Sequence, residues 1–445
     1  MIRSLPTIPR PTATAEIPLL SDEILLDRFQ ERAFRYFVEC VNRENGLVAD
    51  TTRPHYPSSI AVVGFALTCY LAGVERGWIR RDDAALLTLA ALRFFRGSEQ
   101  SEARDATGHK GFYYHFLDIR TGRRVWQSEL SMIDTALLMA GILAAATYFG
   151  GTSNAEREIR DLAEALYGRT DWRWAQNGGA TVTQGWKPEC GFLHYGWEGY
   201  SEGLILYTLG LGSPSHALEP GSYQTWNRTY QWETIYGRDV LYAGPLFIHQ
   251  FTHAWVDFRG IRDRFMREKR SDYFENSRTA AYIHREYAIR NPGGYKGYGE
   301  NFWGFSAGEG PGVRTMKLDG TVRRFFNYVA RGAPFGPDDG TIHPSVIFGA
   351  LPFAPEIALP AIRKLCKRDA RVGQEFQVPN GLNPTMSGAD ERGWVSEGQF
   401  GLDQGLIVLM IENYRSRFVW NLTRECRYFR EGLRRAGFSG GWLER

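Results

Sequence analysis

The chain has 445 residues, 43% of them apolar and 23% charged, which is the composition of an ordinary globular protein. Its 53 basic and 50 acidic residues leave a net charge of +3 without a basic face, which argues against nucleic acid or an anionic membrane surface as a partner. No stretch approaches about 18 consecutive apolar residues, so no membrane span is expected.

Residues 1–20 are rich in proline and are expected to form a flexible or loosely docked arm. They lack the apolar core of a signal peptide, so we expect a cytoplasmic protein, or a periplasmic one if a native signal was trimmed. The five cysteines are scattered without a CxxC spacing, which indicates reduced and mostly buried thiols. No cofactor is expected, and the oligomeric state is open.

Apolar residues recur at helical spacing in about a dozen segments, separated by long glycine- and aromatic-rich loops. The expected helices cover residues 25–41, 58–73, 81–95, 135–149, 154–169, 195–207, 247–258, 272–290, 344–351, 355–367, 402–415 and 418–436. There is no regular alternation of strands and helices, and no glycine fingerprint of a nucleotide-binding fold. Paired helices spread evenly over the chain favour an all-α protein, with residues 21–445 forming one (α/α)6 barrel domain.

The stretch from Tyr195 to Tyr207 combines glycines and aromatics with two acids, Glu198 and Glu202, before an apolar run. On a helix these two carboxylates would share one face. A carboxyl group among aromatic rings is partly desolvated, which raises its pKa and keeps a proton available near neutral pH. Glu202 is therefore a candidate general acid for glycosidic cleavage, although a solvated helix start would carry acids too.

Two further stretches place an acid at the start of an apolar helix. Glu129 and Asp134 lie on either side of Ser131, where Asp134 either belongs to a helix cap or contacts sugar hydroxyls. Asp403 follows a glycine and precedes another apolar helix, so it is either a cap or the base that activates water.

Trp and Tyr are abundant, with 13 and 22 copies, and both stack on sugar rings as readily as they fill a core. The candidate substrate-binding residues are Trp126, Tyr114, His115, His194, Trp197, Tyr200, His249, Glu300, Trp303, Asp338 and Asp339, besides Asp134. Asp338 and Asp339 share one turn, so at most one is expected to face a ligand. His249 and His253 have metal-ligand spacing, but no third ligand is evident and no metal is expected.

Several of these motifs together resemble the glycoamylase-like domain of bacterial endo-β-1,2-glucanases and cyclic β-1,2-glucan synthases. The resemblance spans roughly residues 25–440 and rests on residues 126–135 (WQSELSMIDT), 199–202 (GYSE), 242–249 (YAGPLFIH), 338–342 (DDGTI) and 402–405 (LDQG). It implies an (α/α)6 barrel that acts on β-1,2-glucan or its oligosaccharides. It also implies that Glu202 is the general acid and Asp403 the general base of an anomer-inverting endo-β-1,2-glucanase, with the proton reaching the base through a substrate hydroxyl.

The transglycosylating relatives implied by the resemblance retain the anomer and use a nucleophilic glutamate, for which Glu129 is the candidate by its position in the motif. The motifs therefore leave inverting hydrolysis and retaining transglycosylation open. A glucan-binding protein without activity is a third reading, and a sugar epimerase-like barrel with opposed histidines is a fourth.

Overall fold

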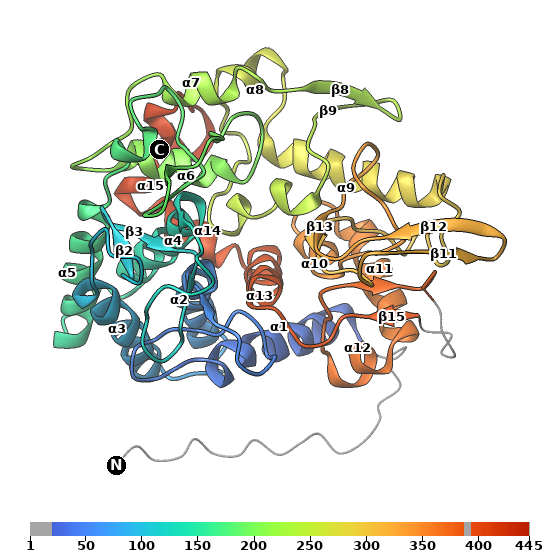
Figure 1. Ribbon diagram of the computed structural model, residues 1–445, viewed down its shortest axis with the longest axis horizontal. Coiled ribbons are helices and arrows are strands. Elements are labelled where there is room, and N and C mark those ends of the chain that lie inside the picture. The colour runs from blue at the N-terminus through green and yellow to red at the C-terminus, as the bar shows by residue number, and fades with distance from the viewer. Residues whose placement is uncertain (1–19, 387–392, 445) are drawn as a thin grey trace.

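The computed structural model describes residues 20–386 and 393–444. The arm expected at residues 1–20 lies outside the described residues, except for Leu20. In the described part, helices pack around a main hydrophobic core that extends from Leu25 to Leu443 (Figure 1). All five cysteines are free, and Cys69, Cys366 and Cys426 are buried, as the sequence predicts.

A closed ring of helices forms the centre of the molecule. Its members in chain order are α2 (Ile60–Glu75), α4 (Met132–Tyr148), α6 (Gly203–Gly212), the 3-10 turns η3 (Leu246–His249) and η4 (Thr252–Ala254), α10 (Ser345–Gly349) and α13 (Gly401–Arg415). α2, α4 and α6 pack in order, as do the two turns with α10 and α13, and α13 packs against α2. Between α6 and the turns, Thr252 of η4 donates a hydrogen bond to the carbonyl of Glu202, the residue before α6. In Figure 1, α13 is seen nearly end-on, with α2 and α4 on one side and α10 on the other.

A second set of helices packs outside this ring. It comprises α1 (Asp22–Glu39), α3 (Arg81–Gly97), α5 (Asn154–Arg169), α9 (Tyr273–Arg290), α11 (Pro355–Arg368), α14 (Phe418–Arg424) and α15 (Arg427–Arg435). α1 covers α13 and α2, α5 covers α4, α15 covers α6, and α11 covers α10. Shorter helices occupy the loops: η2 (Trp174–Gln176), α7 (Ser222–Asn227), α8 (Arg264–Glu268), α12 (Ala370–Glu375) and η5 (Gly441–Glu444).

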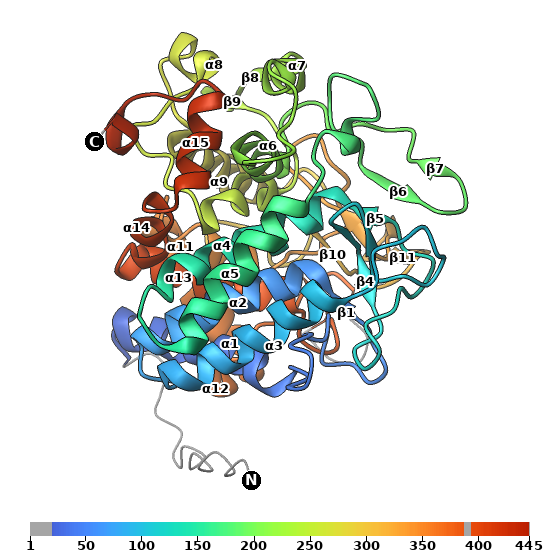
Figure 2. The ribbon, with the colours of Figure 1, turned by 90° about the vertical axis from the view of Figure 1, so that its left-hand side faces the viewer.

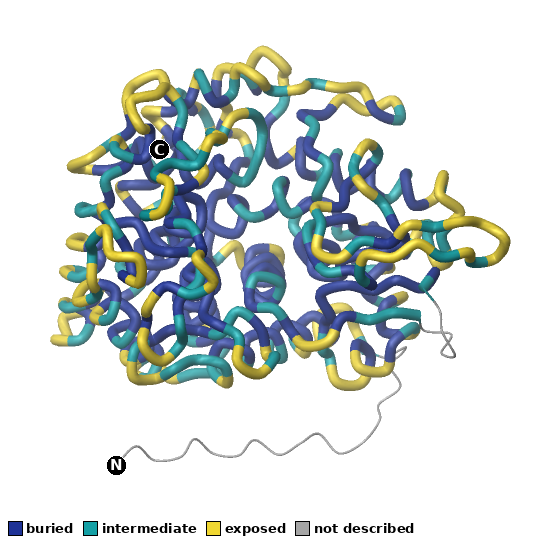
Figure 3. Tube along the Cα trace, viewed as in Figure 1, coloured by how far each residue is buried: buried dark blue, intermediate teal, exposed yellow. Residues whose placement is uncertain are grey.

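The sequence explains which helices are inside. In α2 every residue from Ile60 to Gly73 is buried, so this helix is apolar all round, as is typical of a helix enclosed by others. In α5 the buried positions recur at helical spacing, including Ile159, Ala163 and Leu166, while every charged residue of the helix except Glu156 lies outside the buried set. Buried residues accordingly concentrate in the ring, and exposed residues in the outer loops (Figure 3).

Short antiparallel strands are the main departure from the all-α expectation. They are β1 (Ser58–Ser59), β2 (Gly108–His109), β3 (Phe112–Tyr114), β4 (Phe116–Leu117), β5 (Leu130–Ser131), β6 (Gly185–Lys187), β7 (Gly191–Phe192), β8 (Trp232–Ile235), β9 (Arg238–Leu241), β10 (Ala307–Gly308), β11 (Arg314–Leu318), β12 (Thr321–Phe325), β13 (Val329–Ala330), β14 (Leu382–Asn383) and β15 (Trp394–Val395). Five of them form a sheet in the order β2-β3-β5-β6-β7. Figure 2 shows β1, β4–β7, β10 and β11 gathered at one end of the helices.

Three expected helices differ from the structure. The helix expected at residues 195–207 begins only at Gly203 and continues to Gly212, so residues 195–202 lie outside it. Residues 247–258 form the turns η3 and η4 instead of one helix, because His, Thr, Phe, Trp, Val and Asp are all weak helix formers. Residues 418–436 form two helices, since Cys426 adopts an extended conformation that ends α14 before α15 begins. Among the described residues, no helix combines the length and apolar character needed to cross a bilayer.

α2 and α4 approach each other through two glycines. A Cβ added to Gly141 would collide with the backbone of Gly64, and one added to Gly64 would collide with the carbonyl of Leu137. Neither neighbour can yield, because both are main-chain atoms inside buried helices. The absence of side chains at 64 and 141 therefore sets the spacing of the ring on this side.

We predict that Gly141→Ala lowers the free energy of unfolding by roughly 1–3 kcal/mol or more, because a methyl group forces the two helices apart. Urea unfolding followed by circular dichroism measures this change. Gly97→Ala is the matched control, since Gly97 also lies in a helix but has open space around it, and it should change stability by less than about 0.5 kcal/mol. Equal stability of the two variants would contradict the close approach of α2 and α4.

Candidate active site

The N-terminal ends of the ring helices surround a cavity of about 620 Å³. Its charged and polar lining residues are Asp50, Tyr56, Ser59, His115, Glu129, Ser131, Asp134, Gln184, Glu202, Ser306, Glu309, Tyr328, Ser345, Asn380 and Asp403, with Trp197 among the apolar ones. The side chains of Glu202, Asp134 and Asp403 enter it from the starts of α6, α4 and α13. Acids that are about 200 positions apart in the chain therefore share one cavity.

Glu202 is the residue immediately before α6, and its side chain makes no capping hydrogen bond with that helix. Burial raises the pKa of this carboxyl to about 7, and the neighbouring charge of Asp134 adds to the effect. Such a group still carries a proton in a large share of molecules at neutral pH and can donate it. Glu198 lies outside the helix, where Thr181 donates a hydrogen bond to it, so the two acids do not share a helix face.

Asp403 lies in the first turn of α13 with a protein donor on each carboxylate oxygen. The Ser345 hydroxyl donates to Oδ1 at 2.6 Å and the Asn380 amide donates to Oδ2 at 2.7 Å. Burial raises the pKa of Asp403 to about 6, while these two hydrogen bonds work in the opposite direction. Asp403 is therefore held in a fixed orientation and is ionised at neutral pH.

His115 links two other acids on the cavity wall. Its Nδ1 lies 2.9 Å from Oε1 of Glu129, and its Nε2 lies 3.6 Å from Oδ2 of Asp134. Burial favours the neutral imidazole, but the charges of Asp134, Glu129 and Asp50 outweigh it and raise the pKa of His115 to about 9. Burial also acts to raise the pKa of Glu129, yet the hydrogen bond and charge of His115 lower it overall.

His115, Glu129 and Asp134 also have the residue types of a metal site, and their ligand atoms lie within 4.8 Å of one another. The two ring nitrogens, however, are directed at different carboxylates, as in an imidazolium that donates on both sides. Ser131 further donates to Asp134 at 2.5 Å while capping α4, so this acid is both a helix-cap partner and a cavity residue. The geometry favours an ion-pair triad over a metal centre.

The cavity also contains residues that sequence reasoning missed. Asp50 precedes α2 by ten positions and has a pKa raised to about 6 by burial, with the charge of His115 opposing the shift. Glu309 forms a two-pronged ion pair with Arg53 at 2.5–2.6 Å. None of them follows the pattern of glycine, acid and apolar helix, and loop residues of this kind give no distinctive sequence signal. Tyr328 and Asn380 also line the cavity without any sequence signal, and Asn380 donates a hydrogen bond to Asp403.

The sequence model of a family described as "Glycoamylase: Putative glucoamylase" matches residues 194–427, more than half of the chain, including Glu202 and Asp403. The chain belongs to this glycoamylase family. The family likeness expected from the short motifs is thereby confirmed.

A curated relative of this glycoamylase-family chain is the exo β-1,2-glucooligosaccharide sophorohydrolase (non-reducing end) of Parabacteroides distasonis, 27% identical over 447 residues. The match covers 92% of this chain and 57% of the relative, so the chain spans little more than half of that protein's length. A Bacteroides uniformis crystal structure with the family's description is 28% identical, with a TM-score of 0.83 over 95% of this chain and 99% of that chain. The endo-β-1,2-glucanase of Chitinophaga pinensis shares the fold at 24% identity, with a TM-score of 0.79. The match covers 95% of this chain and 100% of that chain.

Several predicted binding residues lie outside the cavity lining, and these predictions are corrected. Trp303 and Tyr114 are fully buried, the latter beneath Arg124. His249 is buried against Tyr200 in the layer below the cavity, where Asn276 and the carbonyl of Ala243 contact its ring. Aromatic flanks are equally typical of core packing, which is why these residues resembled sugar contacts.

The remaining corrections concern Tyr200, Glu300, His194, Asp338 and Asp339. Tyr200 is outside the cavity lining, and its ring packs against Tyr230 and His249. Glu300 pairs with Arg285 on the surface, and His194 is exposed beside Tyr195. Asp338 accepts hydrogen bonds from the hydroxyls of Tyr287 and Tyr298, so it holds loops together. Asp339 forms a fully buried ion pair with Arg331.

Trp126 lies beside the cavity without lining it. Its side chain is 60% exposed and its ring packs against Tyr56 and Phe116, both of which line the cavity. Trp126 and Gln127 both have a left-handed backbone, which is rare for two successive non-glycine residues and is typical of loops near functional sites.

We predict that the Cε1 proton of His115 titrates with a pKa of about 9, because the surrounding carboxylates outweigh burial. Glu129→Gln should lower this pKa, since it removes a charged acceptor. Proton NMR titration measures both values, with the His115→Gln spectrum identifying the resonance. His249 is an internal comparison, since burial lowers its pKa to about 4. A His115 midpoint at or below the ordinary value of about 6.5 would contradict the triad.

Proposed function

We propose that this glycoamylase-family chain is a glycoside hydrolase that cleaves β-1,2-linked glucan and its oligosaccharides. The observation that carries the proposal is the meeting of Glu202, protonated near neutral pH, with Asp403, ionised at the same pH, in one cavity. Two carboxyl groups with separated pKa values are the machinery of glycosidic cleavage. The substrate class is supported by the activity named for the Parabacteroides distasonis relative.

We further propose that residues 21–445 form one (α/α)6 barrel. The ring and its outer helices support this architecture. The turns η3 and η4 take the place of the fourth inner helix that such a barrel is expected to have. Convergence of the inner-helix N-termini gives the barrel one functional end. Backbone N–H groups at helix starts favour bound polar oxygens there.

In the proposed mechanism, Glu202 donates its proton to the glycosidic oxygen as the bond from that oxygen to the anomeric carbon breaks. Water attacks the anomeric carbon from the opposite face and forms the new carbon–oxygen bond. Asp403 accepts the proton released by this water, directly or through a substrate hydroxyl. The donors Ser345 and Asn380 keep Asp403 oriented and ionised until that proton arrives.

The contacts of Glu129 favour inversion over retention. A retaining enzyme needs a carboxylate free to attack the anomeric carbon. Glu129 instead accepts a hydrogen bond from His115, whose positive charge stabilises the carboxylate and reduces its reactivity. We therefore assign His115, Glu129 and Asp134 to binding sugar hydroxyls and to shaping the charge of the site.

The purified protein is expected to release new reducing ends from β-1,2-glucan, and Glu202→Gln and Asp403→Asn should each reduce the rate by about 10²–10⁴-fold or more. Glu198→Gln is the matched control because this exposed acid lies four positions away, outside the cavity, and it should keep full activity. Absence of cleavage by the wild-type protein, or near-full activity in either cavity variant, would refute the assignment.

The same reaction tests the stereochemistry and the mode of attack. Proton NMR of the first-formed product should detect the α-anomer from the β-linked substrate, and a β-anomer product would indicate retention. A mixture of intermediate lengths early in the reaction indicates endo action, whereas accumulation of one short product from the start indicates exo action.

A bell-shaped pH dependence of kcat/KM is expected, with its maximum between about 6 and 7. Below about 6 the base Asp403 becomes protonated, and above about 7 the acid Glu202 loses its proton, so activity falls on both sides. Initial rates at low substrate concentration between pH 4 and 9 (roughly two units beyond each limb) measure this profile. Activity that keeps rising above pH 8, about one unit past the Glu202 pKa, would contradict Glu202 as the acid.

A further inference from the structure

Tyr328 is an aromatic residue in the same cavity as the acids, and no sequence motif identifies it. It lies between β12 and β13 and lines the cavity, yet its side chain is 66% exposed. Its partners in that lining include Asp50, Asp134, Glu202 and Asp403. Tyr328 therefore shares the cavity with these acids, while much of the residue remains open to solvent.

The contacts of Tyr328 differ from those of other aromatic rings in the lining. Tyr56 and Phe116 pack against Trp126, with ring centroids 5.7 and 5.1 Å apart. For Tyr328, the described part of the chain provides neither a ring contact nor a hydrogen-bond partner for the hydroxyl. An open aromatic face beside polar groups is the surface on which the apolar face of a sugar ring stacks.

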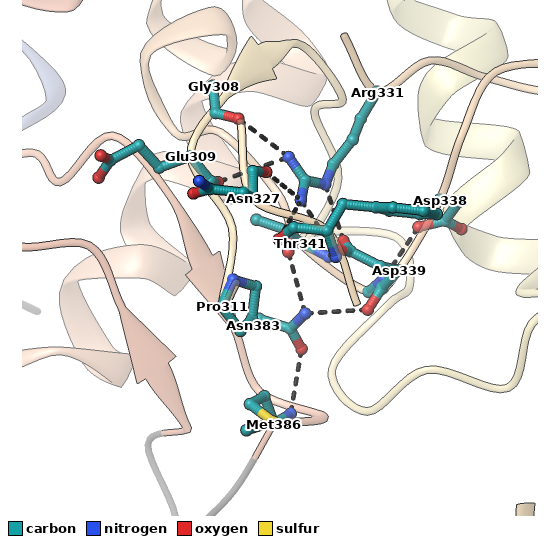
Figure 4. Close-up of polar contacts among 12 residues, drawn as sticks. Gly308, Glu309, Pro311, Asn327, Arg331, Asp338, Asp339, Thr341, Asn383 and Met386 are labelled. Carbon is teal, nitrogen blue, oxygen red and sulfur yellow. Dashed lines mark hydrogen bonds and ion pairs between the residues drawn. The ribbon is translucent and has the colours of Figure 1, made fainter. Parts of the chain in front are cut away.

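A buried ion pair fixes the backbone on which Tyr328 stands. Arg331 and Asp339 are fully buried and joined by two hydrogen bonds of 2.7 Å. The guanidinium also donates to the carbonyls of Gly308 and Asn327, at 3.0 and 3.2 Å. Asp339 in turn accepts from the amide of Phe326 at 2.9 Å. Figure 4 shows Arg331 and Asp339 between the loop that carries Gly308 and Glu309 and the loop that carries Asn327.

The same ion pair thus holds both loops that reach the cavity on this side. One loop carries Glu309, whose carboxylate points away from Arg331 while its backbone carbonyl is turned toward it (Figure 4). The other carries Tyr328, directly after Asn327. Loss of one partner of a buried ion pair leaves an uncompensated buried charge, so Arg331 and Asp339 hold each other and their bonded loops in place. The position of Tyr328 beside the acids is fixed in this way.

We propose that Tyr328 contacts the substrate, its ring stacking on the sugar held over Glu202 and Asp403 and its hydroxyl bonding to a hydroxyl of that sugar. The inference rests on the proposed glycosidase function and adds the residue that covers the reacting sugar. A sugar seated under this ring is shielded from bulk water, which strengthens the hydrogen bonds and charges acting on it. Arg331 and Asp339 are positioning residues for this contact.

Kinetics on β-1,2-gluco-oligosaccharides separate the two parts of the contact. Tyr328→Phe keeps the ring and should reduce kcat/KM by about 5–10-fold through loss of one hydrogen bond. Tyr328→Ala removes the ring as well and should reduce it by roughly 100-fold. Tyr195→Ala is the matched control, because Tyr195 is 71% exposed but outside the cavity lining, and its kcat/KM should stay within about twofold. Thermal melting of each variant verifies that it is folded.

A binding experiment distinguishes failure of this inference from failure of the proposed function. Glu202→Gln, alone and combined with Tyr328→Ala, is titrated calorimetrically with β-1,2-, β-1,3-, β-1,4- and α-1,4-linked gluco-oligosaccharides. Weaker binding of the β-1,2-linked sugar on loss of Tyr328 supports both proposals. The same loss with a differently linked sugar alone supports the role of Tyr328 and refutes the β-1,2 specificity. Equal binding with and without Tyr328, or no binding of any sugar, overturns the inference.

Discussion

Removal of carboxyl groups from water at the starts of apolar helices is the constraint on which this structure depends. A helix N-terminus favours a negative charge, whereas burial favours the neutral acid, so the outcome for each carboxyl is set by its local partners. Asp403 has two donors and remains an anion near neutral pH, while burial raises the pKa of Glu202 further, to about 7. Burial at a helix start thus makes Glu202 a proton donor and Asp403 a proton acceptor in the same cavity, because only Asp403 has two donors on its carboxylate.

The ring makes this arrangement possible because helices such as α2 and α4 are buried on all sides for most of their length, and these two meet through glycines. The contact of Gly64 with Gly141 brings α2 and α4 together, and the chain between ring helices is left to form the cavity wall. Ion pairs, one partly buried and one fully buried, then fix that wall. His115 does so for Glu129 and Asp134, and Arg331 with Asp339 does so for the loops of Glu309 and Tyr328.

The helices were largely predictable from the sequence, because residues on a buried helix repeat with a fixed period. One exception is residues 247–258, which have an apolar pattern but consist mostly of weak helix formers. The pattern alone does not show which of the two effects prevails. The acids at positions 134, 202 and 403 could be singled out as candidates because each lies next to an apolar run, but the sequence left an ordinary helix cap or a solvated helix start as the alternative. Asp50, Glu309 and Tyr328 stand on loops, where only the folded chain determines which way a side chain faces. The predictions that Trp303 and His249 bind the substrate were wrong, because a residue flanked by aromatics has the same sequence pattern whether it faces a cavity or the core.

The most direct test of the central claim is a crystal structure of the Glu202→Gln variant with a β-1,2-gluco-oligosaccharide bound across the cavity. The account predicts the amide of residue 202 about 3 Å from a glycosidic oxygen, with Asp403 on the opposite face of the sugar and a water or a substrate hydroxyl between them. A sugar whose linkages all lie away from residue 202, or one whose anomeric carbon rests against Glu129, would contradict it.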